Sequence, residues 1–339
     1  MATASSEGYA ALIERELLAA VPKDGPQAHL YQLIADYPAR GGKRFRPTLC
    51  LAACGIAGGR SSDAVDAAVA LELLHNAFLV HDDIADASRS RRGAPTLHER
   101  FGLPLALNAG DGLFALALER VAAASSGKPR IASALWAEFS HMLRRTVEGQ
   151  AVELGWLADE RWTITDQQYL AMVRDKTCWY SFIHPLRVGT LLGCGAVGDD
   201  AFVELGFLIG AVFQIHDDLL NLVGDADAYD KDLGCDLVEA KRTLPVLHLL
   251  LHGSPAEVAL LRSCVGRDRE LSARERLDRV VPVLEARGSI AHARSIAQGL
   301  AARAVAEVEA TFGVQARSPD LATLLEVIEP LLFAPALRT

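Results

Sequence analysis

The amino-acid sequence predicts an all-α fold, built as a single domain over residues 1–339. Half of the residues are apolar and only 6% are aromatic, a composition that suits helices packed around a large core. Apolar residues recur at helical spacing along almost the whole chain. No sustained β alternation and no convincing linker interrupts this pattern, so we expect one helical domain.

The first distinctive segment follows two short helical patterns at 9–21 and 30–38. It reads Gly41-Gly42-Lys43-Arg44-Phe45-Arg46-Pro47. Glycines followed by cations at the start of a helix can surround an anion with backbone N–H groups and positive charge. An ordinary solvated turn is the alternative interpretation of this segment alone.

The next helix is expected over residues 63–83, with Ser62 as its N-cap. It is apolar on nearly every face, which is typical of a buried, central helix. It ends in His81-Asp82-Asp83, and Asp86 follows on the same face as Asp82 because positions i and i+4 align. Carboxylates at a helix C-terminus oppose the helix dipole, and burying them requires a positive partner.

A second copy of this pattern lies 135 residues later, in Phe213-Gln214-Ile215-His216-Asp217-Asp218. Here Asn221 shares a face with Asp217. A solvated helix end would explain one such cluster, but two copies that each end an apolar helix favour a hard divalent cation. Oxygen ligands make that cation Mg²⁺.

Arginines adjoin the first cluster in the polar loop 87–96, which contains Arg91 and Arg92. Metal ions and arginines both bind phosphate oxygens, so a polyanionic substrate accounts for both groups. The remaining chain adds a loop at 224–234 and further helical patterns at 103–124, 131–157, 200–222, 255–265, 271–286, 288–312 and 319–334.

Composition argues against several other functions. The net charge of −9 does not favour nucleic-acid binding. Residues 1–8 show no secretory signal, and no uninterrupted apolar run approaches the 18 or more residues of a membrane span. The six cysteines form no CxxC pair. We therefore expect buried, reduced thiols and a cytoplasmic protein.

Together these residues resemble the trans-isoprenyl diphosphate synthases, or polyprenyl synthetases, over residues 30–250. The matching segments stand in the family's order, and their joint spacing is specific: Gly42–Pro47, Asp82–Asp86, Arg91–Gly93, Gly149-Gln150, Lys176-Thr177, Phe213-Gln214, Asp217-Asp218, Lys231 and Lys241–Thr243. The resemblance implies an isoprenoid-synthase-type bundle of mostly antiparallel helices around a deep central cavity. It also implies a homodimer.

The implied activity is Mg²⁺-dependent head-to-tail (1'-4) condensation of isopentenyl diphosphate with an allylic diphosphate. By similarity, three Mg²⁺ ions accompany the bound diphosphate, and their protein ligands are Asp82, Asp86 and Asp217. The substrate-binding residues are then Lys43, Arg46, His75, Arg91, Arg92 and Lys231. The catalytic residues, which stabilise the leaving diphosphate or the allylic cation, are Lys176, Thr177, Gln214 and Lys241.

The chain departs from the family pattern at a few positions. Asn221 replaces a frequent third Asp but still carries a carbonyl oxygen, and Ala240 stands where Gly is usual. Trp179 and Tyr180 are bulkier than the common residues after Lys-Thr, and we ask whether they narrow the cavity.

Product length is predicted from the helix before Asp82, along which the growing tail should run. A bulky Phe78 argues against very long products, whereas the small Ala77 leaves room beyond the shortest. We expect a C15–C20 all-trans product, with geranylgeranyl favoured over farnesyl diphosphate.

Two alternatives share parts of this pattern. A class I terpene cyclase has the same fold class and an Asp-rich metal site, but it normally has a different second metal motif and needs no isopentenyl diphosphate site. A non-catalytic subunit of a heteromeric synthase usually loses aspartates from one motif, whereas this chain keeps both.

Overall fold

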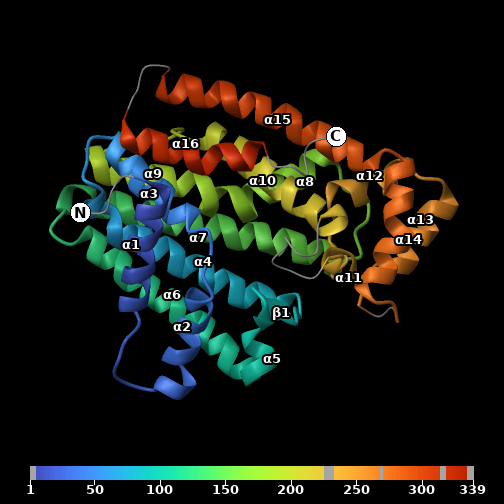
Figure 1. Cartoon of the computed structure of the whole chain (residues 1–339), viewed down its shortest axis with the longest axis horizontal. Helices are drawn as coiled ribbons and strands as arrows, with labels where there is room; N and C mark the ends of the chain where they lie inside the picture. The colour runs from blue at the N-terminus through green and yellow to red at the C-terminus, as the bar shows by residue number, and fades with distance from the viewer. Residues whose placement is uncertain (1–4, 225–232, 268–269, 314–317, 334–339) are drawn as a thin grey trace. The chain divides into compact units, whose positions relative to one another are not determined.

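The computed structural model describes residues 5–224, 233–267, 270–313 and 318–333. Helices make up most of this part of the chain (Figure 1). Its β-structure is a single antiparallel hairpin, β1 (Ser90–Arg91) with β2 (Ala94–Pro95). The all-α prediction is therefore confirmed. All six cysteines are free, and four of them are buried.

The chain divides into two compact units, each assembled from separate segments. Unit 1 comprises residues 1–143, 180–203 and 312–329, and unit 2 the remainder. The helices wholly in unit 1 are α1 (Ser6–Ala19), η1 (Gln27–His29), α2 (Tyr31–Ala39), α3 (Phe45–Ile56), η2 (Ser61–Ala64), α4 (Val65–Ala85), α5 (Leu97–Phe101), α6 (Leu103–Ser125) and α9 (His184–Cys194). The prediction of a single domain stays a prediction.

Unit 2 contains most helices of the second half of the chain. They are α8 (Asp166–Val173), α10 (Val203–Val223), α11 (Cys235–Val238), α12 (Leu244–His252), α13 (Pro255–Cys264), α14 (Ala273–Ala286) and α15 (Ser289–Phe312), with the first residue of α10 and the last of α15 assigned to unit 1. Three further elements contribute residues to both units: α7 (Pro129–Ala158), the π-helix η3 (Arg174–Ile183) and α16 (Pro319–Leu332).

Helix α4 forms the core of unit 1. Most of its residues are buried, and it packs against α6, α3 and α1. Residues 61–85 form a helical segment that is long and apolar enough to cross a membrane by length and composition. However, 67% of its apolar 18-residue window is buried inside the protein. This burial on several sides is what the sequence predicts for a central core helix.

Helices α3 and α9 approach closely because glycines replace side chains at their contact. A Cβ atom on Gly189 would lie 2.2 Å from the carbonyl oxygen of Cys50, and one on Gly193 would lie 2.5 Å from that of Cys54. Gly195 has a different role: it ends α9 in the left-handed conformation at φ +82°. These contacts fix α9 against the helix that follows the basic segment.

Candidate active site

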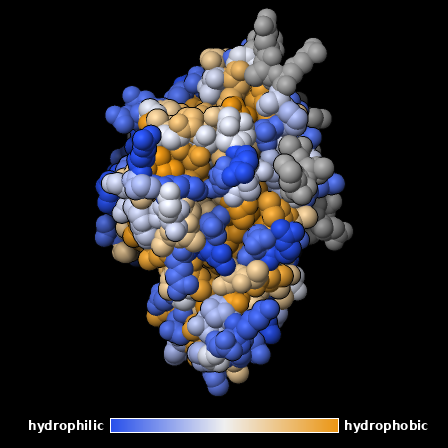
Figure 2. All heavy atoms as spheres, turned by 90° about the vertical axis from the view of Figure 1, so that its left-hand side faces the viewer, coloured by the Kyte–Doolittle hydropathy of each residue, from blue (hydrophilic) through white to orange (hydrophobic). Residues whose placement is uncertain are grey.

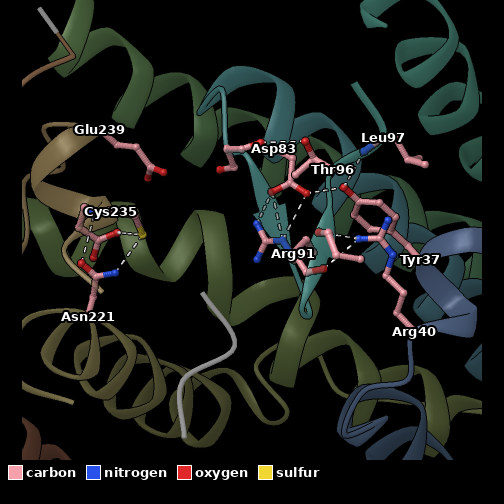
Figure 3. Close-up of polar contacts among 12 residues, drawn as sticks. Tyr37, Arg40, Asp83, Arg91, Thr96, Leu97, Asn221, Cys235 and Glu239 are labelled. Atoms are coloured by element: carbon pink, nitrogen blue, oxygen red, sulfur yellow. Dashed lines mark hydrogen bonds and ion pairs between the residues drawn. The ribbon is translucent and has the colours of Figure 1, made fainter. Parts of the chain in front are cut away.

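In unit 1, the two adjacent aspartates at the end of α4 differ in their surroundings. Asp83 is 1% exposed and accepts a hydrogen bond of 2.5 Å from the hydroxyl of Tyr37. The Arg91 guanidinium also binds it, through Nε at 3.1 Å and through NH2 (Figure 3). Asp82 is only partly buried. Asp83 is thus an internal anchor, and Asp82 is the carboxylate available to a ligand.

Local contacts position this cluster. Asp86 is the C-cap of α4, and its N–H donates to the carbonyl oxygen of Asp82 at 2.7 Å. Arg40 donates to the carbonyl oxygens of Arg91 and Pro95, which fastens the hairpin to α2 (Figure 3). Burial and the charge of Asp83 raise the pKa of Tyr37, so its hydroxyl remains a hydrogen-bond donor at neutral pH.

A basic cluster around Arg46 and His75 lies in the same unit. Arg46 is 5% exposed and donates to Ser181 Oγ at 3.1 Å and to the Tyr180 hydroxyl at 3.0 Å. The Tyr180 ring also stacks on His75, with centroids 6.1 Å apart. Within the described residues, the Nδ1 atom of His75 is buried without a hydrogen-bond partner. A buried polar atom in this state is costly, and an incoming acceptor or donor would satisfy it.

Arginines surround this histidine. Burial lowers the pKa of His75 well below its usual value, and Arg46, Arg92, Arg91 and Arg44 lower it further. The imidazole therefore stays neutral while positive charge accumulates around it. Such a site favours an anion strongly, because an anion offsets the mutual repulsion of the guanidinium groups.

The backbone of the glycine-rich segment contacts Arg92, one of the arginines around His75. Arg92 donates to the carbonyl oxygens of Tyr37, at 3.1 Å, and Gly41. Gly42 has φ +143°, a conformation that L side chains rarely adopt, and a Cβ atom there would displace Arg92 NH2 from its place, so glycine is favoured. Arg44 is structural, because it pairs with Glu72 at 2.6 Å in the interior. Lys43 is exposed.

In unit 2, a chain of side-chain hydrogen bonds likewise holds the second of two adjacent aspartates. Thr177 Oγ1 donates to Gln214 Oε1 at 3.0 Å, and Gln214 Nε2 donates to Asp218 Oδ1 at 2.9 Å. The Tyr169 hydroxyl donates to the other oxygen of Asp218 at 2.6 Å. Asp218 is 5% exposed, whereas Asp217 is only partly buried. The second aspartate is again the anchor.

The charge on Asp218 is finely balanced. Burial raises the pKa of its carboxyl to about 7, and the charge of Asp236 adds to this, while the hydrogen bonds from Tyr169 and Gln214 act in the opposite direction. A nearby cation would lower the pKa of Asp218 and favour its charged carboxylate form.

Asn221 serves the fold of this cluster. Its amide nitrogen donates to Cys235 Sγ at 3.0 Å, and its carbonyl oxygen accepts from the N–H of Asp236 at 3.1 Å (Figure 3). Lys241 pairs with Glu239 at 2.6 Å and lies 3.5 Å from Asp236. Cys235, Asp236 and Glu239 present ligand atoms within 4.8 Å of one another. Both polar atoms of the Asn221 side-chain amide therefore already have hydrogen-bond partners within this cluster.

The π-helix η3 presents Lys176 and Thr177. Lys176 forms an ion pair with Glu153. A Cβ atom on Gly149 would lie 2.2 Å from the backbone nitrogen of Lys176, so Gly149 lets η3 and α7 touch. Single π-helical turns often occur at functional sites. The Gly149-Gln150 landmark thus includes a residue required for packing.

The structure assigns the predicted site residues to the two units as follows. Unit 1 contains Lys43, Arg46, His75, Asp82, Asp86, Arg91 and Arg92, and unit 2 contains Lys176, Thr177, Gln214, Asp217 and Lys241. Lys231 lies outside the described residues. The sequence does not point to Tyr37, Tyr169 and Glu239, because a single tyrosine or glutamate carries no signal without its distant partner.

The donor atoms at the ends of α4 and α10 suit Mg²⁺. Asp82 and Asp86 offer carboxylate oxygens from one end of α4, and Asp217 offers one from α10. Asp83 and Asp218 are excluded from this role by the tyrosines that hold them inside. Hard oxygen donors without nitrogen or sulfur are the ligands that Mg²⁺ prefers.

Known proteins show the same fold and sequence pattern. Residues 27–282 match the family model described as polyprenyl synthetase. A short chain isoprenyl diphosphate synthase from Methanothermobacter thermautotrophicus is 34% identical over 258 residues, 76% of this chain and 77% of that protein. An octaprenyl diphosphate synthase from Escherichia coli is 29% identical over 269 residues, 79% of this chain and 80% of that protein.

Solved structures agree with this result. The geranylgeranyl pyrophosphate synthetase of Pyrococcus horikoshii superposes with a TM-score of 0.83 at 30% identity, covering 96% of this chain and 95% of that one. The geranylgeranyl pyrophosphate synthase of Corynebacterium glutamicum, a complex with isoprenyl diphosphate and magnesium, shares the fold at 24% identity, with a TM-score of 0.84 over 97% of this chain and 99% of that one. The chain belongs to the polyprenyl synthetase family, and it is a prenyltransferase with the all-α isoprenoid synthase fold.

Proposed function

We propose that this prenyl diphosphate synthase condenses isopentenyl diphosphate head-to-tail with allylic diphosphates to give a C15–C20 all-trans product, with geranylgeranyl diphosphate favoured over farnesyl diphosphate. One observation carries the proposal: the buried, unpartnered Nδ1 of His75 lies among arginines, in the same unit as the carboxylates that end α4. The short-chain and geranylgeranyl synthases among the relatives support the product range.

The two diphosphates are bound by different groups. Isopentenyl diphosphate binds at Lys43, Arg46, His75 and Arg92, where neutral His75 provides a hydrogen bond and the arginines provide charge. The allylic diphosphate binds through Mg²⁺ held by Asp82, Asp86 and Asp217. Further contacts come from Arg91, Lys176, Lys231 and Lys241. The ion pair with Asp83 holds the Arg91 guanidinium in position for this contact.

Chemistry begins when the allylic C–O bond breaks. Bound Mg²⁺ supplies positive charge for the leaving diphosphate, and Lys176 and Lys241 add to that stabilisation. The hydroxyl of Thr177 and the amide of Gln214 place oxygen dipoles near the allylic cation, held in position by their mutual hydrogen bond. C4 of the isopentenyl double bond attacks C1 of the cation, which leaves the positive charge on C3 of the isopentenyl unit. The released diphosphate then takes a proton from C2 of that unit, and the new double bond forms between C2 and C3. No protein base is needed.

One assay tests the reaction. The protein is incubated with Mg²⁺, isopentenyl diphosphate and, separately, C5, C10 and C15 allylic diphosphates, and the products are identified. We expect elongated diphosphates. Cyclic hydrocarbon formed without isopentenyl diphosphate would instead support a terpene cyclase, and turnover only after a second chain is added would support a non-catalytic subunit.

Two variants test the assignment of the sites. Asp82→Ala should abolish turnover with the fold intact, and substantial residual activity would contradict its role as a metal ligand. His75→Gln should raise KM for isopentenyl diphosphate more than KM for the allylic substrate. His29→Asn, which changes an exposed histidine of η1, is the matched control.

We also propose a cytoplasmic homodimer. The surface drawn in Figure 2 mixes apolar patches with hydrophilic side chains. Along α6, Leu103, Leu107 and Leu118 are 54%, 47% and 41% exposed. Their spacings of four and eleven residues place them on one face of the helix. A second copy of the chain would bury this apolar face, in agreement with the dimer that the family resemblance implies.

A further inference from the structure

Three histidines of unit 2 lie ring against ring, apart from the residues assigned to either substrate. His248 and His252 are one turn apart on α12, with ring centroids separated by 4.5 Å. The ring centroid of His292 on α15 lies 4.4 Å from that of His248. Imidazoles on one tetrahedral Zn²⁺ have centroids about 5 Å apart, because Zn–N bonds are about 2.1 Å long. The two observed spacings, both to His248, are slightly shorter than that value.

Two of these rings already have the outer partners that metal-binding histidines use. Ser289 Oγ, at a fully buried residue, lies 2.9 Å from Nδ1 of His248. Asp166 Oδ2, in the first turn of α8, lies 2.9 Å from Nε2 of His292. A metal-binding histidine almost always donates its other ring N–H to such a group, which fixes its tautomer and orientation. Nε2 of His248 and Nδ1 of His292 are then the atoms that face a ligand.

Charge and exposure at this cluster also suit a metal. Asp166, which hydrogen-bonds to His292, brings a carboxylate that would offset part of the charge of a bound cation. His252 is exposed, so its ring is able to turn toward the other two.

We propose that His248, His252 and His292 bind one divalent transition-metal ion of the Zn²⁺ type through ring nitrogens, with Ser289 and Asp166 as outer hydrogen-bond partners. Imidazole ligands suit Zn²⁺, Cu²⁺ and Ni²⁺, whereas Mg²⁺ prefers the carboxylates at the ends of α4 and α10. The ion links α12, α15 and, through Asp166, α8. This site is independent of the proposed reaction.

Zn²⁺ binding tests the proposal directly. Untagged protein, saturated with Mg²⁺ and without diphosphate, is titrated with Zn²⁺ in a calorimeter. We expect one Zn²⁺ per chain and a higher Tm in its presence. His252→Asn and His292→Asn should each weaken binding at least about tenfold, and Ser289→Ala about 10–100-fold. The exposed His29 of η1 provides the control, since His29→Asn should leave binding unchanged.

A second measurement identifies the ligands. Co²⁺ bound at the same place should show visible absorption of a low-symmetry nitrogen site, without the sulfur charge-transfer band of a thiolate. Zn²⁺ binding that is lost in Cys235→Ser but retained in His252→Asn would place the ion at Cys235, Asp236 and Glu239 and overturn the proposal. A wild-type titration with no Zn²⁺ uptake would overturn it as well.

Discussion

At the residue scale, both Asp-rich helix ends use a tyrosine to separate two neighbouring carboxylates. Tyr37 holds Asp83 and Tyr169 holds Asp218, each through a short hydroxyl hydrogen bond to a buried oxygen. The preceding aspartates, Asp82 and Asp217, stay partly exposed. Because the anchored residue cannot turn outward without leaving its partner unpaired, the helix end presents its first aspartate in a defined orientation.

This arrangement predicts a specific effect of removing one hydroxyl. Tyr37→Phe should lower the free energy of unfolding by about 1.5–3 kcal/mol, the value of a hydrogen bond to a charged group. It should also raise the Mg²⁺ concentration needed for half-maximal activity. Tyr9→Phe is the matched control, because Tyr9 donates to Asp320 at 2.5 Å elsewhere in unit 1. An equal rise in Mg²⁺ requirement in both variants would contradict the anchoring role.

A second residue-scale prediction concerns Ala240. This alanine adopts φ +57°, a left-handed conformation that costs an L-residue roughly 1–2 kcal/mol and that glycine adopts freely. Ala240→Gly should therefore raise the free energy of unfolding by about 1 kcal/mol, measured by urea titration. Ala137→Gly, at an exposed position inside α7, should lower it by about 0.5–1 kcal/mol. A loss of stability in both variants would show that Ala240 is not strained.

The sequence could identify chemistry-bearing residues only where they stand close together in the chain. Asp82 and Asp86 share a helix face, so periodicity alone predicted that they bind a cation together. Their supporting residue does not, because Tyr37 lies 46 positions before Asp83, and Tyr169 lies 49 before Asp218. Periodicity also left open which aspartate of each pair is buried, since neighbours on a helix differ by about 100°.

At the element scale, α4 presents an aromatic residue where the product tail is expected. Phe78 meets the ring of Phe114 at 5.4 Å and that of Tyr180 at 5.3 Å, both edge to face. Ala77, next to it, is fully buried. The Tyr180 hydroxyl also accepts a hydrogen bond from Arg46, so Tyr180 contacts both the basic cluster and Phe78. These contacts bear on whether Tyr180 narrows the cavity, which stays a prediction.

Product length should follow Phe78. Phe78→Ala removes the ring that contacts both other members of this aromatic group and should shift the product toward longer prenyl diphosphates, detected by chromatography of the dephosphorylated alcohols. Ala77→Phe should shorten it, although the added ring also overpacks a buried position at a cost of about 1–3 kcal/mol. An unchanged product spectrum in both would mean that the tail does not pass this turn of α4.

A buried ion-pair network joins α7 and α9 in unit 1 and makes stability depend on pH. Glu138 accepts from His184 at 2.7 Å and from Arg187 NH2 at 2.6 Å. Burial raises the pKa of Glu138, but these two partners lower it more, to about 2. Burial lowers the pKa of His184, only partly offset by Glu138. Both groups therefore resist protonation in the folded state.

The sign of the pH effect follows from these shifts. Both folded pKa values lie below the unfolded ones, so the stabilisation is complete above about pH 6.5 and declines as pH falls toward 2. Urea unfolding of wild type and Glu138→Gln at several pH values should give a difference that is largest near neutrality and shrinks in acid. Glu309→Gln, at an exposed position of α15, is the control. If the difference in unfolding free energy between wild type and Glu138→Gln stayed constant across the pH range, Glu138 and His184 would not be the source of the pH dependence.

Among the elements, helices with periodic apolar residues could be predicted, whereas the short hairpin and the π-helix could not. The periodic segment at 131–157 corresponds to α7 (Pro129–Ala158), and that at 288–312 to α15 (Ser289–Phe312). The loop at 87–96, in contrast, contains the hairpin β1–β2, which is too short for any alternation. The π-helix η3 arises where Gly149 allows a close backbone approach, a tertiary contact without a local sequence signal.

At the scale of the whole molecule, the apolar face of α6 bears on assembly. Leu107 and Leu118 are 47% and 41% exposed on the surface of unit 1. Fully burying a leucine side chain contributes about 1.5–3 kcal/mol, so several such residues on each of two copies would stabilise the proposed symmetric dimer. A C₂ interface of this kind places the same stripe on both sides. Its strength then depends twice on every substitution.

The proposed dimer should therefore be sensitive to charge on this stripe. Leu107→Lys combined with Leu118→Lys introduces four like charges per dimer into the proposed interface, and we expect it to sediment as a monomer where the wild type sediments as a dimer. Leu251→Lys, on an α12 side chain that is 71% exposed, is the matched control and should remain dimeric. Helical content measured by circular dichroism distinguishes dissociation from unfolding. A double variant that stays dimeric would show that the chains associate through another face.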